Sequence, residues 1–316
     1  MIIEWDNPRL AGADRAVRML RELASQLRES LDRGLASFEV LVGGTDDILS
    51  PDLAKRIRSV WCEGANGLPE IQLTIVEDGS YYMLKNAIAS RASGDLFVFL
   101  DSDVIPEPGW LTGMLAPFCD PAVQVVCANS YVDLESVFGR IMALIWFFPL
   151  RSEGGAVRPV ERFFANSVAF RRELFLHYRF PTIEGTDRGS CLKLAQRLGA
   201  DGVVIYQNPS ARVKHPPPND SREFLVRALG EGRDTVLCAR FARPGWSGLP
   251  DGWLIPACRR MWCAVVRTFR DYRRVGLTLA HLPAVIAVAF CFYGLCVCGA
   301  TISFISPRFA RSHFRI

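Results

Sequence analysis

The chain has 316 residues, long enough for one large domain or two small ones, and its 50% hydrophobic and 22% charged residues exclude a disordered or collagen-like chain. The formal net charge of +4 is modest, and basic residues gather near the C-terminus, which favours a membrane surface over nucleic acid as a partner. Ten cysteines are scattered without zinc-ribbon spacing, so we expect reduced thiols and a cytosolic main domain.

The first 128 residues alternate strand and helix patterns, and residues 1–7 read as a strand rather than a signal peptide. We expect strands at 2–5, 38–42, 71–76 and 96–100, an amphipathic helix over 10–31 and a helix over 82–93. The run at 96–100, Leu-Phe-Val-Phe-Leu, is unbroken by polar residues, as expected for a central strand buried on both faces. This succession predicts an α/β fold with a mostly parallel sheet flanked by helices.

The next segments are less regular. Residues 141–150 are apolar but too few to cross a bilayer, so they fit a core or interfacial segment. A helix is expected over 190–198 and a strand over 203–206, followed by a proline-rich turn at 215–218. Residues 221–275 then form a basic, aromatic-rich helical region.

No charged residue occurs from Leu282 to Ile305. A stretch of ~20 apolar residues suffices to cross the hydrocarbon core, so we expect one transmembrane helix here. Arginines are denser before this segment than after it, which places the N-terminal domain in the cytosol by the positive-inside rule. A buried helix of a soluble core is the alternative.

Two carboxylates follow the central strand directly, in Asp101-Ser102-Asp103. Ligands of open α/β sheets bind beyond the carboxyl ends of the strands. A carboxylate pair at that edge suits a hard cation such as Mg²⁺ or Mn²⁺, which would neutralise a diphosphate leaving group. A solvated turn is the alternative, because Asp-Ser-Asp is also favourable turn chemistry. The buried strand before the motif and the sequence Pro-Glu-Pro-Gly-Trp-Leu after it favour the metal site.

The segment from Lys85-Asn86 through the Asp-Ser-Asp motif to Pro108-Gly109-Trp110-Leu111 resembles the family-2 glycosyltransferases of GT-A fold. In that family a strand ends in an Asp-x-Asp motif that binds the metal and the sugar-nucleotide, and an Arg/Lys-Asn dipeptide opens the preceding helix. The resemblance extends over residues 1–235 and is most specific over 81–111. It implies a GT-A (Rossmann-like) domain, to which the sequence adds C-terminal basic helices and the transmembrane helix.

The resemblance also implies residues that bind the nucleotide-sugar. They are Glu4, Asn7, Asp46, Asp78, Lys85, Asn86, Asp101 and Ser102. The first strand lacks the proline that the family places before the base, and the second ends in Gly43-Gly44 where the family has aspartate. Asp46 and Asp78 are therefore weighed against a helix cap or a turn.

The metal ligands implied in this way are Asp101, Asp103 and His215, and a structural histidine is the alternative for the last. The family's general base is an aspartate before a helix that ends in Arg-Leu. Asp187 matches it by register, with Lys193-Leu194 in place of Arg-Leu, and Glu184 is the second candidate. Threonine stands where the family has glutamate before the base, and a helix cap is the structural alternative for Asp187.

These features predict an inverting glycosyltransferase that moves a sugar from a nucleotide-sugar to a hydroxyl acceptor, with Mg²⁺ or Mn²⁺ as cofactor. The inversion is implied by the resemblance. The apolar segments suggest an acceptor that is lipid-linked or a polysaccharide precursor, at the cytosolic face of the cell (inner) membrane, and no nucleic acid partner is expected. A non-catalytic membrane-attached nucleotide-sugar-binding protein and a nucleotidyltransferase remain alternatives, although residues 1–12 lack a glycine-rich nucleotide loop.

The expected organisation has five parts. They are a nucleotide-sugar-binding half at 1–128, an acceptor-binding and catalytic half of the same domain at 129–235, a basic amphipathic juxtamembrane region at 236–281, the transmembrane helix at 282–305 and a short basic tail at 306–316.

Overall fold

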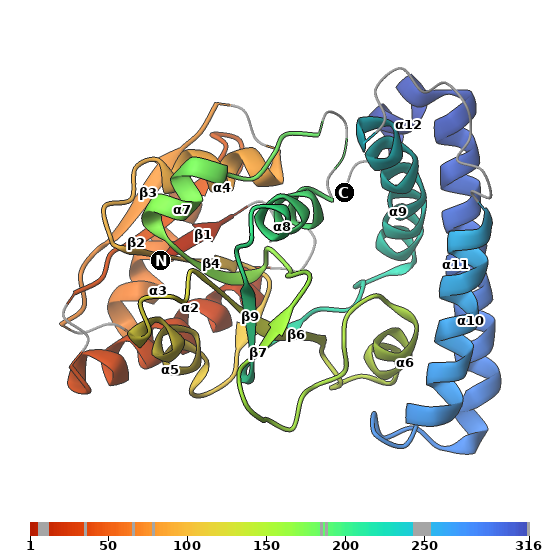
Figure 1. The fold of residues 1–316 in the computed structure, drawn as a ribbon, viewed down its shortest axis with the longest axis horizontal. Helices are drawn as coiled ribbons and strands as arrows, with labels where there is room; N and C mark the ends of the chain where they lie inside the picture. Colours follow the sequence, from red (N-terminus) through yellow and green to blue (C-terminus); the bar gives the residue numbers. More distant parts are fainter. Residues whose placement is uncertain are drawn as a thin grey trace. The chain divides into compact units, whose positions relative to one another are not determined.

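The computed structural model describes residues 1–5, 13–34, 37–64, 67–77, 80–183, 186, 189–242 and 254–314 (Figure 1). The chain divides into two compact units. Unit 1 comprises 1–131, 151–182 and 190–215, and unit 2 comprises 132–150, 183–189 and 216–316. All ten cysteines are free thiols, as their scattered positions predict.

Unit 1 is a sheet with helices on both faces. Its strands are β1 (Ile2–Glu4), β2 (Val40–Gly44), β3 (Ile71–Ile75), β4 (Leu96–Asp101), β5 (Ile105–Pro106), β6 (Val125–Val132), β7 (Arg158–Val160), β8 (Ser167–Arg171) and β9 (Ile205–His215). Its helices are α2 (Ala13–Asp32), α3 (Pro51–Gly64), α4 (Tyr81–Ala89), α5 (Trp110–Leu115) with the 3₁₀ turn Ala116–Cys119, α7 (Arg172–Tyr178) and α8 (Ser190–Ala200).

The sheet has the order β3-β2-β1-β4-β8-β6-β9-β5, with β7 paired to β9. Strands β3, β2, β1 and β4 are parallel. Strand β8 is antiparallel to β4 and β6, and β5 and β7 are antiparallel to β9. The sheet is therefore only partly parallel, and the expectation of a mostly parallel sheet holds for its first half. An apolar run predicts that a strand is buried but carries no information on its direction.

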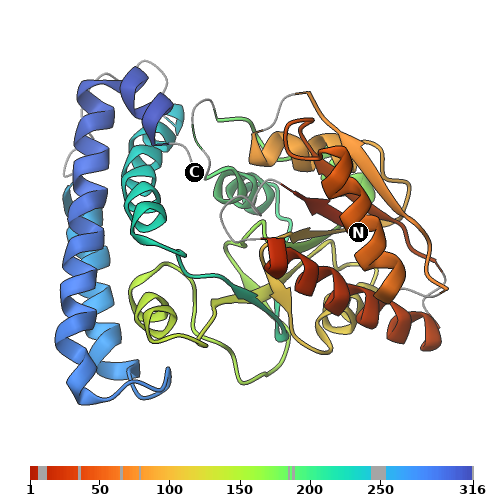
Figure 2. The same cartoon turned by 180° about the vertical axis from the view of Figure 1, so that it is seen from behind.

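Helices cover both faces of the sheet (Figures 1 and 2). A hydrophobic core lies on each face. Successive residues of a strand point to opposite faces. Val98 and Leu100 of β4 accordingly pack with α2, α3 and α5, whereas Phe97 and Phe99 pack with α4, α7 and α8. Gly43 lets α4 approach β2, because a Cβ at this position would overlap Ile88. Strand β4 is thus held from both sides, which fixes the position of its carboxyl end.

Unit 2 is helical. Its elements are α6 (Val137–Ile145), α9 (Ser221–Ala242), α10 (Leu254–Asp271), the 3₁₀ turn Leu279–His281, α11 (Leu282–Ile305) and α12 (Pro307–His313). The bounds of α11 coincide with the apolar segment predicted from the sequence. Helices α9 and α11 are in backbone contact, since a Cβ at Gly232 would overlap Cys296 and one at Gly299 would overlap Leu229. Among the described residues, one helix, Leu279–Ile305, is long and apolar enough to cross a membrane, with a mean hydropathy of 2.3.

Candidate active site

The carboxyl ends of β1, β2 and β4 lie next to one another at one edge of the sheet. Glu4 pairs in register with Gly43 on one side and with Asp101 on the other. Side chains at the same register of parallel strands point to the same face, so the carboxylates of Glu4 and Asp101 are brought together. Both are buried, and two buried negative charges require a cation or several hydrogen bonds.

Helix α4 supplies that compensation to Asp101. Nζ of Lys85 lies 2.5 Å from Oδ1 of Asp101, and the lysine side chain is completely buried. The Tyr81 hydroxyl donates a hydrogen bond of 2.7 Å to Oδ2 of Asp101. Burial and the nearby charge of Asp101 raise the pKa of Tyr81 well above its usual value, so the hydroxyl keeps its proton. Tyr81 and Lys85 are one helical turn apart, which is why both reach the same carboxylate.

Asp103 has a different neighbour. Its buried Oδ2 lies 3.9 Å from Nε2 of His215, at the end of β9, which is beyond hydrogen-bond distance. The two segments are joined by the pairing of β5 with β9. Arg15 of α2 also joins them, since its Nε donates to the Asp103 carbonyl at 2.6 Å and its Nη2 to the Lys214 carbonyl at 2.9 Å. The sequence did not single out Arg15 for this position.

The side chains around Asp103 fit a divalent cation. Carboxylate oxygens are the preferred ligands of Mg²⁺ and Mn²⁺, and neutral imidazole is a common metal ligand. Within the described residues, no three His, Cys, Asp or Glu side chains gather as a complete metal site. One or two protein ligands suffice, however, where substrate phosphates and water complete the coordination. The buried Ser102 hydroxyl has no hydrogen-bond partner in the described part of the chain, which leaves it available to a polar ligand.

The remaining predicted residues lie elsewhere. Asn86 is bonded to the backbone of Phe180, donating to its carbonyl at 2.8 Å and accepting from its N–H at 3.0 Å. It therefore holds the chain after α7 rather than joining the carboxylates. Asp46 is exposed in the turn that follows β2. The predicted residues outside the described part of the chain are Asn7, Asp78, Glu184 and Asp187.

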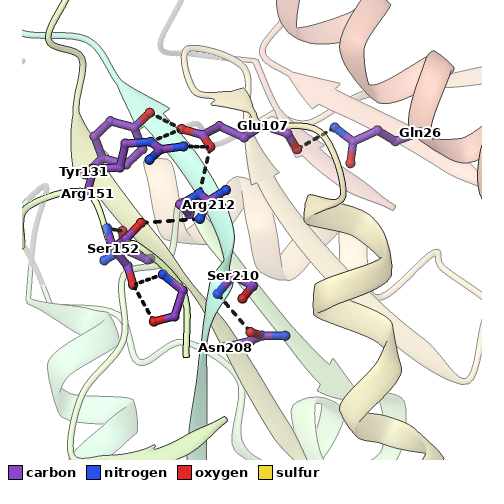
Figure 3. Close-up of polar contacts among 10 residues, drawn as sticks. Gln26, Glu107, Tyr131, Arg151, Ser152, Asn208, Ser210 and Arg212 are labelled. Carbon is purple, nitrogen blue, oxygen red and sulfur yellow. Dashed lines mark hydrogen bonds and ion pairs between the residues drawn. The ribbon is translucent and has the colours of Figure 1, made fainter. Parts of the chain in front are cut away.

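Glu107, four residues after Asp103, is the centre of a charged cluster that the sequence did not indicate. The cluster consists of Glu107, Tyr131, Arg151 and Arg212 (the Glu107 cluster, Figure 3). Nε and Nη2 of Arg151 donate to the two carboxylate oxygens of Glu107 at 2.8 and 2.7 Å. Nε of Arg212 donates at 2.7 Å, and the Tyr131 hydroxyl donates as well. Burial opposes the charge of Glu107, but these donors outweigh it and lower the pKa of Glu107 to about 2.

The Glu107 cluster connects the loop after Asp103 to β9. The Glu107 N–H donates to the Arg212 carbonyl at 2.9 Å. On the other side, Gln26 of α2 donates to the Glu107 carbonyl and accepts from the Leu111 N–H, both at 2.9 Å. Glu107 thereby helps to fix the strand that ends in His215 relative to the segment that begins at Asp103. Its partners are far apart in the sequence, so no local pattern indicates them.

The segment that contains the Asp-Ser-Asp motif matches a known protein family. Residues 85–178 match the family model described as Glycosyl transferase family 2. This segment begins at Lys85, contains the Asp-Ser-Asp motif and ends with α7. The pre-mycofactocin glycosyltransferase of Mycobacterium tuberculosis is 28% identical over 152 residues, which are 45% of this chain and 31% of that protein. The match thus spans less than a third of the relative's length.

Two solved structures resemble nearly the whole chain. The mannosyltransferase PcManGT from Pyrobaculum calidifontis, in complex with GDP-Man and Mn²⁺, has a TM-score of 0.54 at 16% identity and covers 97% of this chain and 86% of that one. S. aureus TarS 1-349, in complex with UDP-GlcNAc, has a TM-score of 0.51 at 12% identity and covers 95% and 90%. The resemblance seen in the sequence is confirmed to this extent: residues 85–178 match the model of glycosyltransferase family 2, and the chain shares the GT-A fold of these two solved structures.

Proposed function

We propose that this chain is a metal-dependent glycosyltransferase that moves a sugar from a nucleotide-sugar to a hydroxyl acceptor with inversion. The observation that carries the proposal is the buried Asp103 carboxylate at the end of the central strand, facing the imidazole of His215. Its position within the family-2 segment, and the nucleotide-sugars bound by the two structural neighbours, favour this activity over other uses of a carboxylate pair.

On the donor side, Asp103 and His215 would hold Mg²⁺ or Mn²⁺. The cation would neutralise the diphosphate that leaves with the nucleotide. The Ser102 hydroxyl, which is buried, would donate a hydrogen bond to the donor. Lys85 and Tyr81 hold the carboxylate of Asp101 in one position. This carboxylate would lie beside the donor, and a group that is already fixed needs no reorganisation during the reaction.

The other nucleotide contacts follow the family resemblance. They are Glu4, Asn7, Asp46 and Asp78, with Lys85 acting through Asp101 and Asn86 through the backbone of Phe180. On the acceptor side, Asp187 would take the proton from the attacking hydroxyl, with Glu184 as the second candidate. A carboxylate suits this role because its proton affinity can be matched to that of a hydroxyl in the transition state.

The acceptor would be lipid-linked or a polysaccharide precursor, used at the cytosolic face of the inner membrane. The apolar helix Leu279–Ile305 and the surrounding arginines suggest that the enzyme works at a membrane. A membrane-bound enzyme meets a lipid-linked acceptor in two dimensions, which raises the local acceptor concentration.

A thermal-shift series with UDP-, GDP- and dTDP-sugars, each with and without Mn²⁺, tests the proposal. We expect one donor to raise the melting temperature only when metal is present, because a ligand bound to the folded state stabilises it by about 2.7 kcal/mol at a hundred times its dissociation constant. The same samples are then assayed for release of the nucleotide. Stabilisation without any release, with or without candidate acceptors, would assign a binding protein instead, and a response to no sugar-nucleotide would remove the proposed donor site.

A further inference from the structure

Helix α10 carries an apolar stripe on its exposed face. Trp262, Val266 and Phe269 have 67%, 44% and 56% of their surface exposed. Their spacing of four and three residues places them on one side of the helix. Arg259 and Arg270, also exposed, lie one turn before and one turn after members of this stripe. A large apolar stripe edged by arginines is typical of a helix that lies in the headgroup region of a bilayer.

The region that contains this stripe is strongly cationic. Residues 254–314 include eight arginines, no lysine, and a single acidic residue, Asp271. Asp271 is buried and paired with Arg270 and Arg274. This excess of positive charge complements an anionic phospholipid surface, where each arginine near the surface contributes about 1 kcal/mol of attraction.

The packing of α11 argues against a crossing of the bilayer by this helix. Tyr293, near the middle of α11, has Glu231, Arg260 and Arg267 as its charged neighbours. Arg260 is paired with Glu231 but keeps 51% of its side chain exposed. If α11 crossed the membrane, Arg260 would stand at the depth of the hydrocarbon core, where an arginine costs about 3 kcal/mol or more.

Helix α11 also cannot cross alone. Its backbone contact with α9 through Gly232 and Gly299 would carry the charged side of α9 into the bilayer with it. Arg233 and Asp234 of α9 form an ion pair inside unit 2, next to this contact. An orientation in the plane of the membrane avoids both costs, because the arginines then reach the phosphates while the apolar side chains enter the acyl boundary.

We propose that unit 2 docks in the plane of an anionic phospholipid bilayer, in place of the transmembrane crossing expected from the sequence. The α10 stripe of Trp262, Val266 and Phe269 inserts into the acyl boundary together with the exposed side of α11, represented by Phe290. The exposed arginines of α10 bind lipid phosphates. This inference rests on the membrane part of the proposed function and makes it more specific. Its tests measure membrane binding and not sugar transfer. The docking proposal can therefore fail while the proposed transferase activity holds, and the reverse.

The first test is flotation of the full chain with vesicles of phosphatidylcholine, with and without phosphatidylglycerol. We expect binding to the anionic vesicles and a loss of about tenfold or more in affinity for the double variant Trp262→Glu, Phe269→Glu. The matched control is Leu192→Glu, which changes an exposed leucine on α8 of unit 1 and should bind as the parent does. All three proteins should have the same melting temperature without vesicles, because the substituted side chains are exposed.

Retained binding by the double variant, or equal binding to neutral and anionic vesicles, contradicts the proposal. The second test distinguishes docking from crossing. Membranes from cells that produce the full chain are washed with alkaline carbonate, which releases proteins bound at the surface and leaves spanning helices in the pellet. We expect release of the chain. Retention in the pellet would show that α11 crosses, and would overturn the in-plane arrangement whatever the vesicle result.

Discussion

Asp101 is the last residue of β4 and Asp103 follows after one intervening residue, yet the surroundings of the two side chains differ. Asp101 accepts hydrogen bonds from Lys85, which is completely buried, and from Tyr81, which is partly buried. Asp103 faces His215 across a distance too long for a hydrogen bond. Lys85 and Tyr81 thus compensate the buried charge of Asp101. Asp103 and His215 are side chains of the types that bind a divalent cation. We therefore propose different roles for the two aspartates of the motif: Asp101 supports the fold, and Asp103 binds the cation.

The substitution Asp103→Asn is the most direct test of the different roles of the two aspartates. We expect a fall of about 10³-fold or more in kcat/KM, since removing a single transition-state contact of this kind costs about 4 kcal/mol. The stabilisation by Mn²⁺ with the donor should disappear in the same variant. The control is Asp95→Asn, at the opposite end of β4, where the exposed carboxylate is far from the site. Equal losses in both variants would mean that the effect is not specific to the Asp103 side.

On the Asp101 side, the substitution Lys85→Met should act on stability first. It leaves the buried carboxylate of Asp101 without its cation beside a second buried carboxylate, Glu4, and breaking a buried pair in this way costs about 3–5 kcal/mol. Urea unfolding measures the loss. The double variant Lys85→Met, Asp101→Asn removes both charges and should recover much of it, as a double-mutant cycle would record. A double variant no more stable than Lys85→Met would show that the pair is not the source of the stability.

The parts of the fold and of the site that could be predicted from the sequence are those with a local pattern. Five apolar residues followed by Asp-Ser-Asp specify a buried strand and its acidic end, and 24 residues without charge specify the bounds of α11. The family resemblance over the same segment located Lys85 near the motif. Each of these signals lies within a short stretch, where the side chains in sequence are also neighbours in space.

The parts that could not be predicted depend on contacts across the sheet. Strand β9 runs from Ile205 to His215, well beyond the strand expected over 203–206, because it pairs with β7 at one end and with β5 at the other. Lys85, expected to bind the nucleotide-sugar, pairs with Asp101, since the register of β4 brings the carboxylate to α4. Lys85 and Asp101 are 16 residues apart, and the partners of β9 lie on other strands, so no local pattern shows that these residues are in contact.

The Glu107 cluster extends the comparison, because its contacts join the segment after Asp103 to strand β9, which ends at His215. Glu107→Gln should lower the free energy of unfolding by about 2 kcal/mol, the usual value of hydrogen bonds to a charged group, and should weaken the stabilisation by Mn²⁺ and donor. A matched control is Glu39→Gln, where a carboxylate bonded to Ser93 and Gly94 lies at the other end of the sheet. That variant should lose stability but keep the metal response. A normal metal response in Glu107→Gln would separate the cluster from the site.

The smallest effect is expected in the pH dependence of the stability difference between the parent and Glu107→Gln. The pKa of Glu107 falls from 4.5 to about 2 on folding, so its ionised form stabilises the native state fully above pH 4.5. As the pH falls from 4.5 towards 2 the carboxyl becomes protonated in the unfolded chain first, and its contribution is lost. The difference in melting temperature between the parent and Glu107→Gln should therefore be constant near neutral pH and shrink below 4.5. A difference that grows with acid would mean that the arginines destabilise Glu107⁻ rather than hold it, which the distances of 2.7–2.8 Å oppose.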